Sequence, residues 1–285
     1  MKLTKTIALS LAVMGTLALG ACGTNVNLSV KTVKLTEEQY AFAIQKGSSL
    51  VAQVNSILTE MKADTSAEGL DGIINSFFDG TATFEYSNPD VATPKANDSK
   101  YFVVGTNAYF PPFEYKTEGK FTGIDMKIAD VIATKLNKTL YIVDTEFSSL
   151  IAGVQAGDYD IAMAGMTITD TRKQQVDFAD PYYTSAQVIT VKEGDTTYDN
   201  CQTAEDVEAI LAAKDSNYKI GTQNGTTGYM YAAGDEDFGY TGFKNLTVKG
   251  YKTGALAMTD LKNGALDAVI LDEQPSKMIV ASFNK

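Results

Sequence analysis

The chain has 285 residues, of which 44% are hydrophobic and 21% charged, a composition typical of a globular protein with room for two domains. Its formal net charge of −11 argues against nucleic acid as a partner. The sequence has no histidine, the commonest general base and metal ligand. We therefore expect no metal, no cofactor and no Ser-His or Cys-His catalysis.

Residues 1–21 have the features of a signal peptide: two lysines precede an apolar run from Ile7 to Leu19 that is short for a membrane span. The run is followed by Gly-Ala-Cys, and this ending resembles the lipobox cut by the lipoprotein signal peptidase. We expect the protein to be exported and lipid-anchored through Cys22 to the outer face of the cytoplasmic membrane, or on the periplasmic side in a two-membrane cell. The alternative is an ordinary secretory signal with an incidental cysteine.

The region from residue 24 to residue 100 begins with a strand-like alternation over residues 28–35, and a short apolar run follows at 40–44. Two stripes with helical spacing come next. Their apolar positions are Leu50, Val54, Ile57, Leu58 and Met61, then Leu70, Ile73, Ile74, Phe77 and Phe78. Residues 79–100 are rich in Gly, Pro, Asn, Thr and Ser, which predicts a linker.

An apolar strand over residues 101–106 leads into a loop at residues 107–115 with the sequence NAYFPPFEY. Two prolines exclude a regular helix or a central strand there. Phe113 is expected in the core, and ordinary core packing is also open to Phe110. A helix follows Asp125, and another begins near Phe147 and stops at a glycine before a strand.

The stretch from Asp160 to Tyr183 contains Arg172, the only arginine in the chain. An arginine fork grips a carboxylate in two places, which a lysine cannot do. Ala164, Gly165 and Thr167 precede it, and Thr169 with Asp170 predicts a helix start. Small residues, a hydroxyl, helix-terminal amides and a guanidinium together predict an anion site. On this chemistry alone, a structural Arg–Asp pair is an equal alternative.

Residues 193–285 repeat the same α/β plan. Thr203 and Asp206 predict a capping box. The Gly/Thr-rich loop after the strand at 219–223 has free amides that could close over an anion, although it lacks the Gly-Lys-Ser/Thr pattern of a phosphate loop. Asp272 ends a buried strand, where α/β sheets place ligands; it could instead cap the next helix.

Three runs carry a family resemblance: AGMTITDTRKQQVDFADPYY, NAYFPPFEY and FTGID. They resemble the signature segments of the family 3 (polar amino acid) solute-binding proteins of ABC importers. The run TEEQYAFAIQKGSSLVAQVNSILTEMKAD, with the helix after it, resembles the carboxyl-terminal end of that family but stands at the front of this chain. We therefore expect a circular permutation, which is tolerated when the old termini lie close together. A helical stalk with a shortened carboxyl end is the alternative.

The resemblance implies an α/β, two-lobed periplasmic-binding-protein type II fold, circularly permuted and with two hinge strands. Residues 22–38 and 193–285 would form lobe 2. Residues 39–79, the displaced family ending, and 101–192 would form lobe 1, and residues 80–100 would join the old termini. The strand over 186–191 is expected to be the first to cross between the lobes.

By resemblance, ligand lies between the lobes. Arg172 and Thr167, with amides near Thr227, would hold its α-carboxylate, while Asp272 and the Gly165 carbonyl would hold its α-ammonium. The expected ligand-binding residues are Asn107, Tyr109, Phe110, Phe147, Ala164, Gly165, Thr167, Arg172, Gln223, Thr226, Thr227 and Asp272.

The implied function is to bind a free L-amino acid and deliver it to an ABC permease as a monomer, without enzymatic activity. Relatives often have Glu at the position of Tyr109, and this residue with Leu271 and Gln223 suggests an uncharged ligand side chain, such as that of glutamine. The alternatives are an enzyme on the same scaffold, similar to cyclohexadienyl dehydratase, and a lipoprotein that acts only as a sensor.

Overall fold

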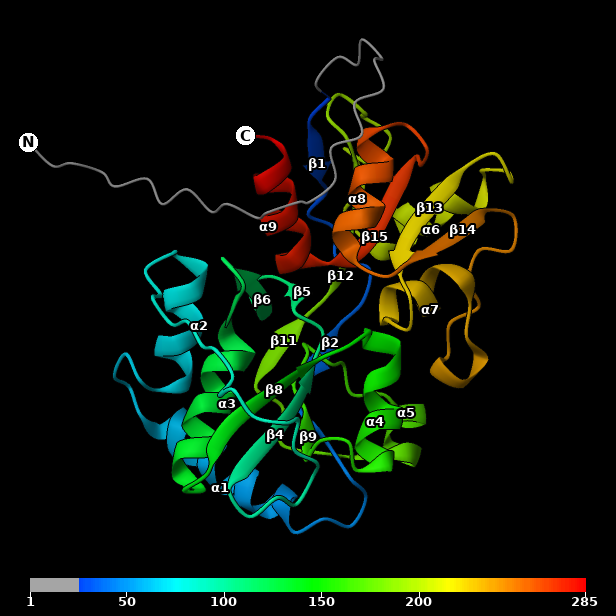
Figure 1. Cartoon of the computed structure of the whole chain (residues 1–285). Coiled ribbons are helices and arrows are strands. Elements are labelled where there is room, and N and C mark those ends of the chain that lie inside the picture. The colour runs from blue at the N-terminus through cyan, green and yellow to red at the C-terminus, as the bar shows by residue number, and fades with distance from the viewer. Residues whose placement is uncertain (1–25) are drawn as a thin grey trace, which may run out of the picture.

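The computed structural model describes residues 26–285, in two α/β lobes (Figure 1). The predicted signal peptide over residues 1–21 and the predicted lipidation site at Cys22 lie outside the described residues. Among the helices between residues 26 and 285, none combines the length and the apolar character that a membrane span requires.

Lobe 2, at the top of Figure 1, is built on a five-stranded sheet in the order β1-β12-β15-β13-β14. β13 is parallel to β14 and β15, and β12 is antiparallel to β1 and β15. The strands are β1 (Leu28–Val30), β12 (Gln187–Lys192), β13 (Lys219–Gln223), β14 (Thr247–Tyr251) and β15 (Ala268–Asp272). The helices are α6 (Ala204–Ala212), α7 (Thr227–Ala233), α8 (Gly254–Lys262) and α9 (Glu273–Phe283), with a 3-10 turn, η2, at Glu236–Phe238.

Lobe 1 is built on a second five-stranded sheet, in the order β10-β3-β9-β4-β8. Its strands are β3 (Ala43–Ile44), β4 (Tyr101–Thr106), β8 (Thr139–Asp144), β9 (Ile161–Ala162) and β10 (Asp177–Phe178). Its helices are α1 (Leu50–Ala63), α2 (Leu70–Phe78), α3 (Ile124–Lys135), α4 (Leu150–Ala156), preceded by the 3-10 turn η1 (Phe147–Ser149), and α5 (Asp170–Gln175). The aromatic loop forms a small sheet of β5 (Tyr109–Phe110), β6 (Glu114–Thr117) and β7 (Lys120–Thr122).

Two strands connect the lobes, β2 (Glu38–Tyr40) and β11 (Tyr183–Ser185), and they pair with each other antiparallel (Figure 1). The crossing therefore lies just before the strand at 186–191 that the sequence suggested. β12 instead belongs to the lobe 2 sheet, between β1 and β15, although the predicted boundary fell at residue 193. The physical reason is burial: Val188, Ile189 and Val191 are fully enclosed, as strands packed on both faces require.

Residues 39–79 are part of the body of lobe 1. β3 pairs with both β9 and β10, so it lies inside the sheet. α1 and α2 pack against α3, and most of the apolar stripes read from the sequence is buried, including Val54, Leu58 and Ile73, whereas Phe78 at the end of the second stripe is 39% exposed. A detached helical stalk is therefore excluded.

The linker segment after α2 follows the edge strand β8. Tyr86 forms an isolated bridge with Phe121, and its hydroxyl donates to the Leu140 carbonyl at 2.5 Å. The Asn88 amide both donates to the Ile142 carbonyl (2.7 Å) and accepts from its N–H (2.8 Å). These bonds occupy backbone N–H and C=O groups of the edge strand β8 that could otherwise pair with a strand of another chain.

Replacing Leu58 by alanine tests whether the front segment contributes to folding. Leu58 is fully buried, so Leu58→Ala should lower the free energy of unfolding by about 2–5 kcal/mol through lost burial and the cavity left behind. Gln53→Ala, an exposed position of the same helix, should change it by less than about 0.5 kcal/mol. Urea unfolding measures both, and equal effects would contradict the integral role of α1.

Candidate functional site

Arg172 is held in place by the short helix that contains it. Thr169 is the N-cap of α5, and its hydroxyl accepts from the Arg172 N–H at 3.2 Å, as the sequence predicted. The guanidinium is buried, with only 4% of the residue exposed. Its Nη1 donates to the Thr167 carbonyl (2.6 Å) and its Nη2 to the Gly225 carbonyl of lobe 2 (2.9 Å). Arg172 therefore bonds to both lobes.

The surroundings of Arg172 favour a planar cation. Its guanidinium carbon lies 5.5 Å from the ring centre of Phe147 and 6.0 Å from that of Phe238. Burial lowers the pKa of Arg172 to about 10, and the negative charges of Glu38 and Asp272 oppose this shift. The group thus remains positively charged at neutral pH.

Asp272 reaches the same region from lobe 2. It stands at the N-cap position of α9, yet its side chain caps no helix amide. Its Oδ1 instead accepts from the Tyr40 hydroxyl on the hinge strand β2. Burial, together with the charge of Glu38, raises the pKa of Asp272 to about 7. The helix-cap alternative is therefore not what this carboxylate does.

Glu38 is a site residue that the sequence did not reveal. It lies on β2 with 3% exposure. Its Oε2 accepts from the Thr167 hydroxyl of lobe 1 (2.6 Å) and the Thr227 hydroxyl of lobe 2 (2.8 Å). A longer bond of 3.4 Å comes from the Gln187 amide. This hinge carboxylate therefore joins hydroxyls of both lobes.

The available signal for Glu38 was its spacing from Tyr40. Residues two apart on a strand share a face, and here both are buried while Gln39 between them is exposed. In the sequence, the neighbouring Thr36 and Glu37 make this position look like a polar turn, because nothing local indicates that the segment crosses between lobes.

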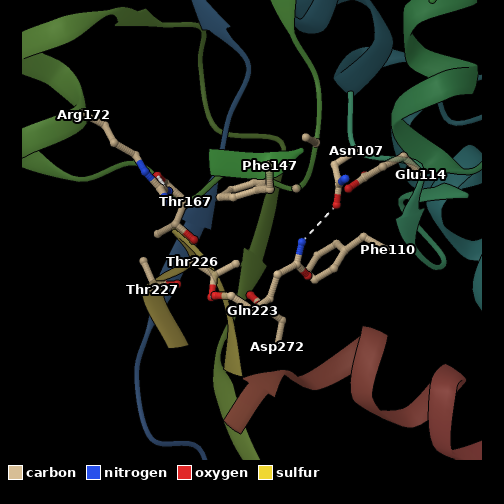
Figure 2. A pocket seen from close by; sticks show the side chains of 12 residues that line it. Asn107, Phe110, Glu114, Phe147, Thr167, Arg172, Gln223, Thr226, Thr227 and Asp272 are labelled. Atoms are coloured by element: carbon tan, nitrogen blue, oxygen red, sulfur yellow. Dashed lines mark hydrogen bonds between the residues drawn. The ribbon is translucent and has the colours of Figure 1, made fainter. Parts of the chain in front are cut away.

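One pocket brings most of the predicted residues together (Figure 2). It is lined by Asn107, Phe110, Phe147, Ala164, Gly165, Thr167, Arg172, Gln223, Thr226, Thr227 and Asp272, with Glu114 as a further member. Tyr109 is the predicted residue that is not among them, because its side chain projects outward and the residue is 51% exposed. Arg172 and Asp272, expected to meet across a groove, do line one pocket.

The lobes are closed on each other in this structure. Besides the Arg172–Gly225 contact, the Gln223 amide of lobe 2 donates to Asn107 Oδ1 of lobe 1 at 3.0 Å (Figure 2). The space left in the pocket is ≈ 10 Å³, about what one water molecule requires. A larger ligand therefore needs the lobes to move apart.

Between residues 26 and 285 no cluster of three or more acidic or cysteine side chains has the geometry of a metal site. Asp272 in the pocket and Glu38 on β2 instead accept hydrogen bonds from the Tyr40 and Thr167 hydroxyls.

Two α/β lobes joined by paired crossing strands, with charged residues buried in the cleft between them, define a ligand-binding protein of the periplasmic type II class. Residues 102–277 match the bacterial extracellular solute-binding proteins, family 3, and the chain belongs to that family. Family members are extracellular or periplasmic.

Individual relatives agree with this assignment. The chain is 32% identical over 200 residues to a probable histidine-binding protein of Neisseria gonorrhoeae, covering 69% of this chain and 66% of the relative. An ancestral arginine-binding protein bound to arginine superposes with a TM-score of 0.52 at 34% identity, covering 64% of this chain and 74% of that one. An ancestral amino acid-binding protein, a precursor of cyclohexadienyl dehydratase, gives a TM-score of 0.54 at 31% identity over the same shares.

Stability should depend on the ionisation of Asp272. Its pKa is raised from 3.8 to about 7 on folding, so the folded state keeps a proton that the unfolded state releases. The stability that this group contributes is fully present below pH 3.8 and is lost as the pH rises through about 7. In unliganded protein, Asp272→Asn should therefore flatten the decline of the unfolding free energy between about pH 4 and about pH 8, measured in urea.

Two further variants test whether the charge of Glu38 contributes to this pH dependence of the unfolding free energy. Glu38→Gln removes the neighbouring charge, so the loss of stability should move to lower pH. Glu37→Gln alters the adjacent exposed carboxylate and should leave the profile as in the wild type. An Asp272→Asn protein with an unchanged pH profile would contradict the assignment.

Proposed function

We propose that this protein binds a free L-amino acid between its lobes and delivers it to an ABC permease, acting as a monomer and without transforming the ligand chemically. The observation that supports this most directly is a buried guanidinium from lobe 1 that lies in the electrostatic influence of buried carboxylates from lobe 2 and the hinge. An α-amino acid carries the complementary charges on adjacent groups. The chain spans about two thirds of the length of the relative from Neisseria gonorrhoeae.

The α-carboxylate would bind at Arg172, with Thr167 and the amides near Thr227. In the closed structure Nη2 of Arg172 is engaged by the Gly225 carbonyl of the other lobe. Opening of the lobes separates that pair and frees the donor for a carboxylate, which is a stronger acceptor than a carbonyl. Closure over the ligand would then follow the hinge motion usual for this architecture.

The α-ammonium would bind at Asp272 and the Gly165 carbonyl. A buried cation favours the ionised form of a neighbouring carboxyl, so binding would displace the proton that Asp272 holds below about pH 7. For the side chain of the ligand we propose an uncharged group, placed among Asn107, Phe110, Phe147 and Gln223. Two amides and two aromatic rings suit a carboxamide or an apolar chain.

We also propose that the chain is a circular permutation of its family, with residues 39–79 as the displaced family ending and 80–100 as the new connection. Three observations support this. Residues 39–79 complete the lobe 1 sheet and helices, the family match begins only at residue 102, and Asn284 bonds to Leu28 beside it in lobe 2. Cys22 would be the lipid anchor.

Arg172→Ala should weaken amino-acid binding by about 3 kcal/mol or more, roughly a hundredfold, because the ligand carboxylate would be buried without its cation. The ligand is first identified by a thermal-shift screen of the twenty amino acids, since a tight ligand stabilises the folded state. Titration calorimetry then gives the affinities.

Lys173→Ala is the matched control, because this neighbouring cation is exposed and does not line the pocket. It should retain wild-type affinity. Unchanged affinity in Arg172→Ala would refute the carboxylate role, and the absence of stabilisation by any amino acid would refute the proposed function.

A further inference from the structure

Glu114 is a fully buried carboxyl group in the wall of the pocket. It begins β6, directly after the two prolines and Phe113, with 0% exposure. Figure 2 shows it on the side of the pocket that also holds Asn107 and Phe110, away from Arg172. It thus lies at the end of the pocket opposite the proposed carboxylate site.

Neither oxygen of Glu114 accepts a hydrogen bond from any described group. The nearby acid Asp125 is already bonded: the Tyr182 hydroxyl donates to it at 2.6 Å and the Gly165 N–H at 2.9 Å. Burial, the charges of Asp125, Asp272 and Asp144, and a hydrogen bond that a protonated Glu114 gives to Asp125 raise the pKa of Glu114 well above its ordinary value. An unsatisfied buried carboxyl costs free energy unless a donor or a proton reaches it.

A second acceptor at the same end of the pocket is also unpartnered. Oε1 of Gln223 has no donor, whereas its Nε2 donates to Asn107 Oδ1. The Asn107 amide in turn donates to the Thr145 carbonyl at 2.7 Å. This chain of bonds fixes which atom of each amide is the oxygen. Glu114 and Gln223 therefore present acceptors without donors.

We propose that Glu114, with Gln223 Oε1, is the subsite that selects ligands by N–H donors at the end of their side chain. This inference rests on the proposed amino-acid binding and revises the side-chain class proposed above: it retains a terminal carboxamide, adds a nitrogen cation, and leaves out an apolar or an acidic group. A terminal NH2 group offers two hydrogens, one for each acceptor.

A different arrangement would satisfy Glu114 without a ligand. If Glu114 is protonated and donates to Asp125, it serves only to hold the Asp125–Gly165 contact behind the pocket wall. In that arrangement Glu114→Gln keeps an N–H donor for Asp125 and alters no ligand preference. The two arrangements thus differ in selectivity and not merely in stability.

The test compares near-isosteric ligands that differ in terminal N–H groups: glutamine with methionine, and lysine with norleucine. Calorimetry is run on wild type, Glu114→Met, Glu114→Gln and the control Glu118→Met, an exposed position on the same hairpin. Whichever of the two ligand pairs the wild-type protein binds, we expect the ligand with terminal N–H groups to bind at least about tenfold more tightly than the ligand without them. Glu114→Met should reduce that preference to less than about threefold, and Glu118→Met should leave it unchanged.

Glu114→Gln retains one carbonyl acceptor, so its preference should fall between those of wild type and Glu114→Met; if Glu114→Met does not fold, this variant decides. A preference that is unchanged in Glu114→Gln, or a wild-type protein that binds the apolar member as tightly, overturns the inference. If amino acids bind in an Arg172-dependent manner but ignore residue 114, only this inference fails. If no amino acid binds at all, the proposed function fails first.

Discussion

The closed structure depends on charges that are buried between two bodies able to separate. Arg172 from lobe 1 and Asp272 from lobe 2 line one pocket, and Glu38 from the hinge is buried and accepts bonds from Thr167 and Thr227, which line the same pocket. Removing each of them from water costs several kcal/mol unless opposite charges and hydrogen bonds replace the lost hydration. The tyrosine and threonine hydroxyls and the carbonyls around them supply those bonds. The Gly225 carbonyl reaches Arg172 from the opposite lobe and Glu38 bonds to hydroxyls of both lobes, so the same contacts that satisfy the charges also hold the cleft shut.

In the function that we propose, a zwitterion replaces two internal partners of the cleft. The ligand carboxylate would take the place of the Gly225 carbonyl at Arg172, and the ligand ammonium would take the place of the proton held by Asp272. Opening of the hinge would expose these groups to water, and closure over a ligand would bury them again, now paired. A ligand shifts the equilibrium only by what it gains over the internal contacts.

The order of segments along the chain matters less than their contacts. β3 occupies an interior place in the lobe 1 sheet, and α1 and α2 complete its helical layer, although they precede the rest of that lobe in the sequence. The paired hinge strands β2 and β11 are far apart in the chain and adjacent in space. Burial and strand pairing act between neighbours in space, so a rearranged order of segments can be accommodated when the connecting segment spans the gap.

Several helices and their caps could be predicted from the sequence because the interactions that form them are local. The stripes of α1 and α2, the Thr169 cap before Arg172 and the Thr203–Asp206 capping box all involve residues within a few positions of one another. The segment around Arg172 carried the family resemblance, and most of the predicted pocket followed from it. Tertiary structure alone decided the rest. Glu38 and Glu114 resemble ordinary surface acids in sequence, and Tyr109 resembles its aromatic neighbours, because burial at a lobe interface is set by distant segments that no local pattern records.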